Sequence, residues 1–168
     1  MTDQKTLILS TERLLQKLNR IAHEIHENHY DDSELVVVGI ADRGFVFAKL
    51  LVSVLKNISN LEIEIHELKI DKKGTLKEIN KQELEKAKLD NKVVIIVDDV
   101  LNSGKTLAYA VKHILEYPVK RLCTAVMVNR RHRLYPVRAD YVGLTLATTI
   151  KEHIHVDLTK GKEAVYLT

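Results

Sequence analysis

The stretch Val93-Val-Ile-Ile-Val-Asp-Asp-Val-Leu-Asn-Ser-Gly-Lys-Thr106 decides the fold of this chain. It opens with apolar, mostly β-branched residues, which is typical of a strand buried on both faces of a parallel sheet. Two adjacent carboxylates, Asp98 and Asp99, follow at the carboxyl end of that strand, where open α/β sheets bind their ligands. The turn that comes next leads into a helix, and Gly104 lets a ligand approach its backbone N–H groups closely. The stretch therefore predicts a phosphate cradle beside an acidic pair.

Three interpretations of this stretch compete. A nucleotide P-loop requires a glycine five residues before Gly104, but Asp99 stands there and would repel a phosphate. A purely structural acidic pair is disfavoured, because adjacent carboxylates at a buried strand end repel each other unless a cation lies beside them. The third interpretation is a ligand that carries both a phosphate, for the glycine turn, and hydroxyl groups, for the acidic pair. Asp98 and Asp99 would then hold ribose hydroxyls and a magnesium ion.

The rest of the chain alternates strands and helices around this segment. Apolar or alternating patterns predict further strands at 35–40, 61–70, 122–128, 140–143, 152–158 and 164–167. Helical spacing of apolar residues predicts helices at 11–28, 44–56 and 104–116. This order indicates one α/β domain over residues 1–168, with a central, mostly parallel sheet flanked by helices. Residues 71–91, rich in lysine and glutamate, predict an exposed and mobile excursion.

Composition and charge exclude several classes of protein. The chain has 168 residues, 45% of them hydrophobic, and a formal net charge of +3, which predicts no general attraction to nucleic acid. Cys123 is the single cysteine, so a disulfide framework and a thiolate metal cluster are excluded. Residues 1–10 show no signal-peptide pattern, and no apolar run approaches the ~20 residues needed to cross a bilayer. A cytoplasmic enzyme without a membrane segment is expected.

The apolar strand, the paired acids and the Ser-Gly-x-Thr turn resemble the ribose-phosphate loop of type I phosphoribosyltransferases. The resemblance implies that family's fold, 5-phosphoribosyl 1-pyrophosphate and a nucleobase as substrates, and Mg²⁺ as cofactor, held by Asp98 and Asp99 through the ribose or water. These two aspartates and Arg43 would be the catalytic residues. The implied 5-phosphate loop is Val100, Leu101, Asn102, Ser103, Gly104, Lys105 and Thr106. The implied pyrophosphate loop is Ala41, Asp42, Arg43 and Gly44.

Four segments in order are similar to one subfamily, the pyrimidine operon attenuator/uracil phosphoribosyltransferases. They are residues 20–25, the loop at Arg43, residues 97–101 and residues 131–143. The resemblance implies uracil as the base and a homodimer or higher homo-oligomer. It also implies a base pocket at Tyr141, Val142 and Gly143, and a flexible hood at about residues 70–91 with Lys69 and Lys72 in place of an arginine. Asn102 stands where purine-specific members have a carboxylate, which favours a pyrimidine.

The subfamily also binds messenger RNA, through a basic surface that dimerisation completes. The matching positions here are Arg20, His23, His132, Arg133 and Arg138, with Arg130 and Arg131 adding charge. The chain departs from the subfamily at residues 144–149, where Leu-Thr-Leu-Ala-Thr-Thr replaces a lysine, an asparagine and a proline. This region of the family holds the base and part of the RNA surface. Transfer to another base and a non-catalytic sensor of phosphoribosyl pyrophosphate therefore stay open as alternatives.

Overall fold

The computed structural model describes residues 5–71, 73–149 and 151–168. Within these ranges the chain forms eight strands and four helices. In chain order they are β1 (Thr6–Leu9), α1 (Thr11–Asn28), β2 (Glu34–Ile40), α2 (Arg43–Ile58), β3 (Glu62–Leu68), α3 (Glu78–Lys86), β4 (Val93–Leu101), α4 (Lys105–Ile114), β5 (Arg121–Asn129), β6 (Tyr141–Thr145), β7 (Ile154–Asp157) and β8 (Ala164–Leu167). No helix in these ranges is long and apolar enough to cross a bilayer.

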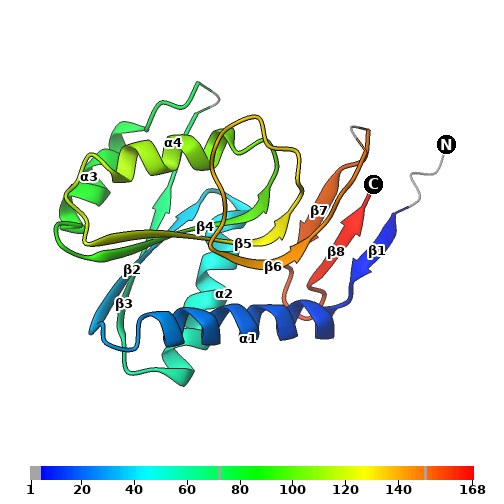
Figure 1. Ribbon diagram of the computed structural model, residues 1–168, viewed down its shortest axis with the longest axis horizontal. Coiled ribbons are helices and arrows are strands. Elements are labelled where there is room, and N and C mark those ends of the chain that lie inside the picture. Colours follow the sequence, from blue (N-terminus) through cyan, green and yellow to red (C-terminus); the bar gives the residue numbers. More distant parts are fainter. Residues whose placement is uncertain (1–4, 72, 150) are drawn as a thin grey trace.

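Five strands form a central parallel sheet in the order β3-β2-β4-β5-β6 (Figure 1). Because successive side chains of a strand point to opposite faces, β2 and β4 each contribute to two cores. Val37 and Ile95 pack with α1 and α2 on one face, whereas Val36 and Val94 pack with α3 and α4 on the other. The predicted α/β fold, a mostly parallel sheet flanked by helices, is confirmed.

A second, antiparallel sheet stands beside the central one in the order β1-β8-β7 (Figure 1). The sequence predicted strands where β7 and β8 occur, but it indicated neither β1 nor the separation of these strands from the central sheet. Val156 of β7 and Val165 of β8 are buried in the core that α1 and α2 share. The small sheet therefore packs against the main domain.

The segment that follows β3 is exposed at most of its described residues, as predicted, but it also packs an apolar face against the domain, which the prediction missed. Leu76, Leu84 and Leu89 are at most 5% exposed and join the core on the α4 face of the sheet. The ring of buried His113 on α4 lies 3.0 Å from the carbonyl oxygen of Gly74 and fastens the loop that precedes α3. Widely spaced leucines thus give the segment an apolar face, which its many lysines and glutamates obscure in the sequence.

Candidate active site

The two predicted carboxylates lie at the end of β4, which runs four residues further than the sequence indicated, to Leu101. Asp98 accepts a hydrogen bond at Oδ1 from the N–H of Asp99 at 2.9 Å. Burial, and after it the negative charge of Asp99, raise the pKa of Asp98 well above its usual range. In the part of the chain that the structure describes, no ion pair joins either carboxylate to a basic side chain. Among the described residues, then, no basic side chain neutralises the pair by direct contact.

This acidic pair suits a magnesium ion. Mg²⁺ prefers oxygen ligands and keeps several of its waters, and a cation would offset the burial and repulsion that raise the pKa of Asp98. The described residues contain no group of three or more His, Cys, Asp or Glu side chains placed to hold a metal. A bound Mg²⁺ would therefore need substrate oxygens and water to complete its coordination.

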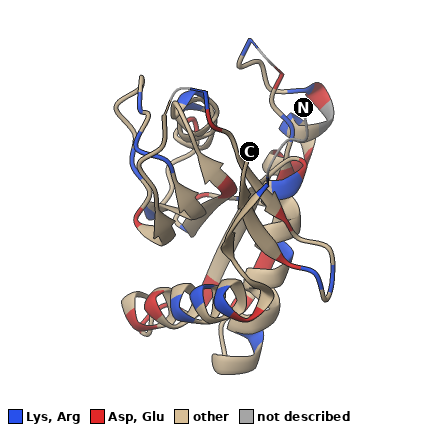
Figure 2. Cartoon of the chain, turned by 90° about the vertical axis from the view of Figure 1, so that its right-hand side faces the viewer, with Lys and Arg blue, Asp and Glu red and all other residues tan. Residues whose placement is uncertain are grey.

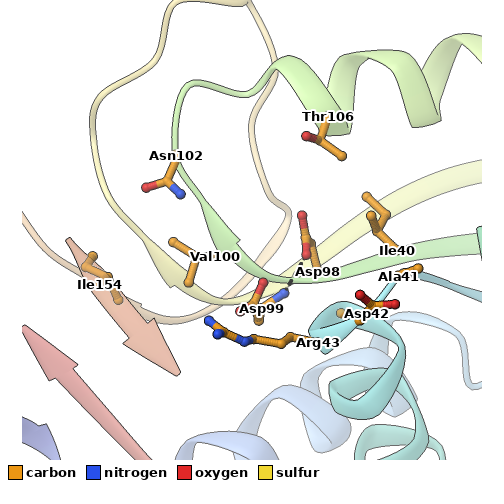
Figure 3. A pocket seen from close by; sticks show the side chains of 11 residues that line it. Ile40, Ala41, Asp42, Arg43, Asp98, Asp99, Val100, Asn102, Thr106 and Ile154 are labelled. Carbon is orange, nitrogen blue, oxygen red and sulfur yellow. Dashed lines mark hydrogen bonds between the residues drawn. The ribbon is translucent and has the colours of Figure 1, made fainter. Parts of the chain in front are cut away.

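The loop between β2 and α2 lies beside the acidic pair, because β2 and β4 are neighbours in the sheet. The residue at position 44 has to be glycine for this contact: a Cβ there would lie 2.8 Å from Oδ1 and 3.0 Å from Cα of Asp98. Arg43, exposed in the first turn of α2, extends its guanidinium beneath Asp99 (Figure 3). The peptide bond between Ala41 and Asp42 is cis. The guanidinium of Arg43 therefore places a positive charge at the pocket, where it can bind an anionic group of a ligand.

The turn after β4 forms the other wall and leads into α4. Gly104 has φ +86°, and a Cβ there would lie 2.7 Å from Cγ2 of Val137, so both conformation and space require glycine. The hydroxyl of Ser103 accepts the N–H of Lys105 at 3.3 Å. The first N–H groups of α4 have no partner within their own helix and point toward this turn. This is the geometry in which helix N-termini bind phosphate.

These parts enclose one pocket of about 420 Å³ at the carboxyl edge of the central sheet (Figure 3). Its lining residues are Ile40, Ala41, Asp42, Arg43, Gly44, Asp98, Asp99, Val100, Asn102, Thr106 and Ile154. Leu101, Ser103, Gly104 and Lys105 of the phosphate loop line an adjoining pocket of about 70 Å³, which shares Asp98, Val100, Asn102 and Thr106 with the first one. The structure thus places the predicted pyrophosphate loop beside the acidic pair and the phosphate loop, although it lies far from both in the sequence. Ile40, at the end of β2, and Ile154, from β7 of the small sheet, are the lining residues that were not among the predicted site residues.

The chain matches the family described as phosphoribosyl transferase domain over residues 5–160. It belongs to this family. The Bifunctional protein PyrR of Bacillus cereus (strain AH820) is 37% identical over 164 residues, which cover 92% of this chain and 91% of that protein. The protein of the same name from Elusimicrobium minutum (strain Pei191) is 35% identical over 170 residues, covering 96% and 95%. The predicted membership and phosphoribosyl transfer chemistry are confirmed.

Solved structures of phosphoribosyltransferases share the fold. The hypoxanthine phosphoribosyltransferase of Trypanosoma cruzi superposes with a TM-score of 0.79 at 16% identity, covering 96% of this chain and 95% of that one. A hypoxanthine-guanine phosphoribosyltransferase of Bacillus anthracis, solved with HEPES in its active site, gives 0.71 at 23% identity, covering 89% and 86%. At these identities the likeness shows the fold alone.

The structure does not bring the predicted base-pocket residues to the pocket of this phosphoribosyltransferase. Tyr141 begins β6, so it lies at the amino end of a parallel strand, whereas the pocket lies at the carboxyl ends. Its hydroxyl is 3.2 Å from Nε2 of His29 and accepts a hydrogen bond from Asn28. Val142 and Gly143 follow in the same strand and are not among the lining residues. The match in sequence order did not reveal which end of the strand faces the site.

The predicted hood residues are also absent from the pocket lining. Lys69 forms an ion pair with Glu67 at 3.3 Å, and Lys72 lies outside the described residues. No described residue of the segment 70–91 lines the pocket, and the small sheet supplies Ile154 instead. In this structure, then, β7 borders the pocket where the hood was expected.

Several residues predicted to bind RNA make contacts within the protein. Arg20 donates to the carbonyl oxygens of Val142 and Gly143 at 2.8 and 2.9 Å, and pairs with Glu24 at 2.6 Å. Arg20 thereby provides hydrogen-bond donors for two backbone carbonyl groups of β6, the edge strand of the sheet. In Figure 2 the ribbon of α1 has its basic residues along the middle and acidic residues toward its ends.

The loop between β5 and β6 holds the remaining predicted RNA residues. Arg133 donates to the carbonyl of Val137 at 3.3 Å, and the ring of His132 lies 2.6 Å from the carbonyl of Thr148. Arg138, like His23 on α1, is exposed. Arg130, by contrast, is 9% exposed, so the expectation that it adds charge to a surface is wrong.

Proposed function

We propose that this phosphoribosyltransferase joins the phosphoribosyl group of 5-phosphoribosyl 1-pyrophosphate to uracil, with Mg²⁺ as its cofactor. The observation that carries the proposal is that an acidic pair and an arginine loop line one pocket, and that a phosphate cradle lines a second pocket adjoining it. Each matches one part of the substrate: the ribose hydroxyls, the pyrophosphate and the 5-phosphate. Uracil is favoured by the resemblance of residues 131–143 to the uracil-specific subfamily and by the relatives named PyrR.

The protein's contribution to transfer is positioning and charge. The N–H groups and hydroxyls of residues 102–106 bind the 5-phosphate, and Asp98 and Asp99 bind the ribose hydroxyls and would hold the metal. Ala41–Gly44, with the guanidinium of Arg43, bind the pyrophosphate. These contacts hold C1 of the ribose at one place in the pocket, so that the base meets it in a fixed orientation.

In the transfer step, a ring nitrogen of the base bonds to C1 while the bond from C1 to the pyrophosphate oxygen breaks. The electron pair of the broken bond leaves with pyrophosphate, and the base gives its N–H proton to water. Positive charge develops on the ribose beside the two aspartates, and negative charge develops on the leaving group beside Arg43. Mg²⁺, when bound, neutralises charge on the pyrophosphate.

A panel of bases tests the proposal. Release of pyrophosphate from phosphoribosyl pyrophosphate and Mg²⁺ is expected with uracil, and Asp99→Asn should abolish it while the circular dichroism spectrum stays unchanged. Asp90→Asn, at an exposed acid outside the pocket, is the matched control and should keep full activity. Release with another base but not with uracil would correct the substrate. No release with any base would leave the non-catalytic sensor as the function.

RNA binding by a homodimer is a second proposed function. It is supported by three arginines that stay exposed on the loop after β5, namely Arg131, Arg133 and Arg138, and by the word bifunctional in the names of the relatives. Filter binding of a pyrimidine-operon leader RNA should weaken steeply as salt rises, because bound phosphates release counterions. Affinity no greater than that of a charge-matched control protein would reject RNA binding. Elution as a monomer in size-exclusion chromatography would reject the dimer.

A further inference from the structure

Arg130 has an unusual environment at the carboxyl end of β5. Among the described residues no other arginine or lysine is buried, and no ion pair joins Arg130 to a carboxylate. Its guanidinium donates to the hydroxyl of Thr148 at 2.6 Å and to the carbonyl of Thr149 at 2.8 Å. Its third contact is Oδ1 of Asn102, at 3.5 Å. Burial of an unpaired charge is costly, so these neutral oxygens must compensate for the lost water.

The contact with Arg130 determines which way the amide of Asn102 faces. A guanidinium has five N–H donors and no acceptor, so only the amide oxygen can face it. At 3.5 Å the hydrogen bond is long, but the opposite rotamer would place two N–H groups against each other. Asn102 is one of the residues that line the pocket, and its amide nitrogen makes no hydrogen bond to any described residue. Figure 3 shows this nitrogen on the Val100 side of the Asn102 side chain.

The pocket has a charged end and an apolar end. Arg43, Asp98 and Asp99 make the charged end, which matches the sugar and pyrophosphate. Val100 and Ile154 lie on the other side, with the amide of Asn102 above them (Figure 3). A flat nucleobase needs apolar surface for its faces and a few polar groups for its edge. The apolar end with its single amide therefore fits the base.

We propose that Asn102 determines which bases are accepted by donating a hydrogen bond from Nδ2 to a carbonyl oxygen of the base, and that Arg130 is the positioning residue that presents this donor. The inference rests on the proposed function and names the class of base, one with an exocyclic oxygen at the contacted position. An amino group there would set donor against donor, so a base that carries one would lose this hydrogen bond. Through Thr148 and Thr149, Arg130 also ties this specificity to the 144–149 segment, in which the chain departs from its subfamily.

Replacing oxygen by sulfur in the base tests this contact without requiring turnover. Binding of UMP, 2-thio-UMP and 4-thio-UMP is measured by calorimetry for the wild type, Asn102→Leu and Arg130→Gln. Sulfur accepts hydrogen bonds weakly, so the wild type should bind one of the two thio-nucleotides about five- to tenfold less tightly than UMP. In Asn102→Leu, UMP should weaken by a similar factor, and the difference between oxygen and sulfur should disappear.

Two further measurements separate the role in specificity from a structural role. Arg130→Gln should lose the same discrimination while its affinity for ribose 5-phosphate stays unchanged, since the charged end of the pocket is intact. Lys112→Ala, at an exposed position of α4, is the control and should behave as the wild type. If Arg130→Gln fails to fold, Asn102→Leu still carries the test. If the base panel selects hypoxanthine or guanine, the same comparison uses IMP and 6-thio-IMP.

The possible results distinguish this inference from the proposed function. If Asn102→Leu weakens UMP and both thio-nucleotides equally, or weakens ribose 5-phosphate as much as UMP, Asn102 does not read the base and the inference is wrong. A wild-type preference for CMP or AMP would also overturn it. In these cases the phosphoribosyltransferase function stands. If the wild type binds neither nucleoside monophosphate nor ribose 5-phosphate, both fail together.

Discussion

Gly44→Ala is expected to destabilise the protein although it places alanine in a helix. The structure predicts two opposing effects. Gly44 lies in the first turn of α2, where alanine should stabilise the helix by at most about 0.5–1 kcal/mol. The added methyl group, however, would lie 2.8 Å from the carboxylate of Asp98, and 3.0 Å from both the Asp98 Cα and the carbonyl oxygen of Val97.

Packing should decide the sign of the change. Two of the three atoms belong to the backbone of the central strand and cannot rotate away, so overpacking should cost about 1–3 kcal/mol. After the helix term is subtracted, a net loss of about 0.5–2 kcal/mol is expected, which lowers Tm by roughly 1–8 °C for a chain of this size. Thermal unfolding by circular dichroism measures it, and pyrophosphate release should fall as well because Asp98 is displaced.

Ser53→Ala is the matched control, since it places alanine at an exposed position of the same helix. It should change the free energy of unfolding by no more than about 0.5 kcal/mol. A Gly44→Ala protein as stable as the wild type, or more stable, would show that the loop and the end of β4 are not in close contact. The assembly of the pocket described above would then be wrong.

Two further changes test the acidic pair and the segment around α3. Asp98→Asn should raise the free energy of unfolding in magnesium-free buffer near neutral pH, because the pKa of Asp98 is raised in the folded state and wild-type stability therefore falls as pH rises above the ordinary aspartate value. The stability advantage of Asp98→Asn over the wild type should vanish by about pH 4. Mg²⁺ should stabilise only the wild type. A difference in the free energy of unfolding that is the same at every pH would contradict this prediction. Leu84→Ala should cost about 2–5 kcal/mol in thermal unfolding, because Leu84 is 1% exposed; a mobile segment would show almost no loss.

The sequence predicted the central sheet and much of the pocket because their signals are local. A run of buried β-branched residues followed at once by Asp98 and Asp99 indicates both the strand and the edge where ligands bind. The glycines at 44 and 104 mark close approaches that the structure explains by single contacts. The order of the elements along the chain then predicts that the loops after β2 and β4 lie close together, because parallel strands end at the same edge of the sheet.

The remaining features depend on contacts that period and composition do not reveal. β1 pairs with β8, which is distant from it in the sequence. The alternation of apolar and polar residues in a strand does not indicate which sheet the strand joins. Tyr141 pairs with Ala125, four residues before the carboxyl end of β5, and this register directs it away from the pocket. Arg130 looks like one more basic residue of an exposed loop, and only the position of Thr148 and Thr149 shows that it is buried.

The small sheet makes one border of the pocket depend on strands that are distant from it in the chain. Ile154 belongs to β7, β7 pairs with β8, and β8 also pairs with the first strand of the structure. The strand that borders the pocket is therefore held by β8 and, through β8, by β1, so loss of either partner would loosen this border although neither of them lines the pocket.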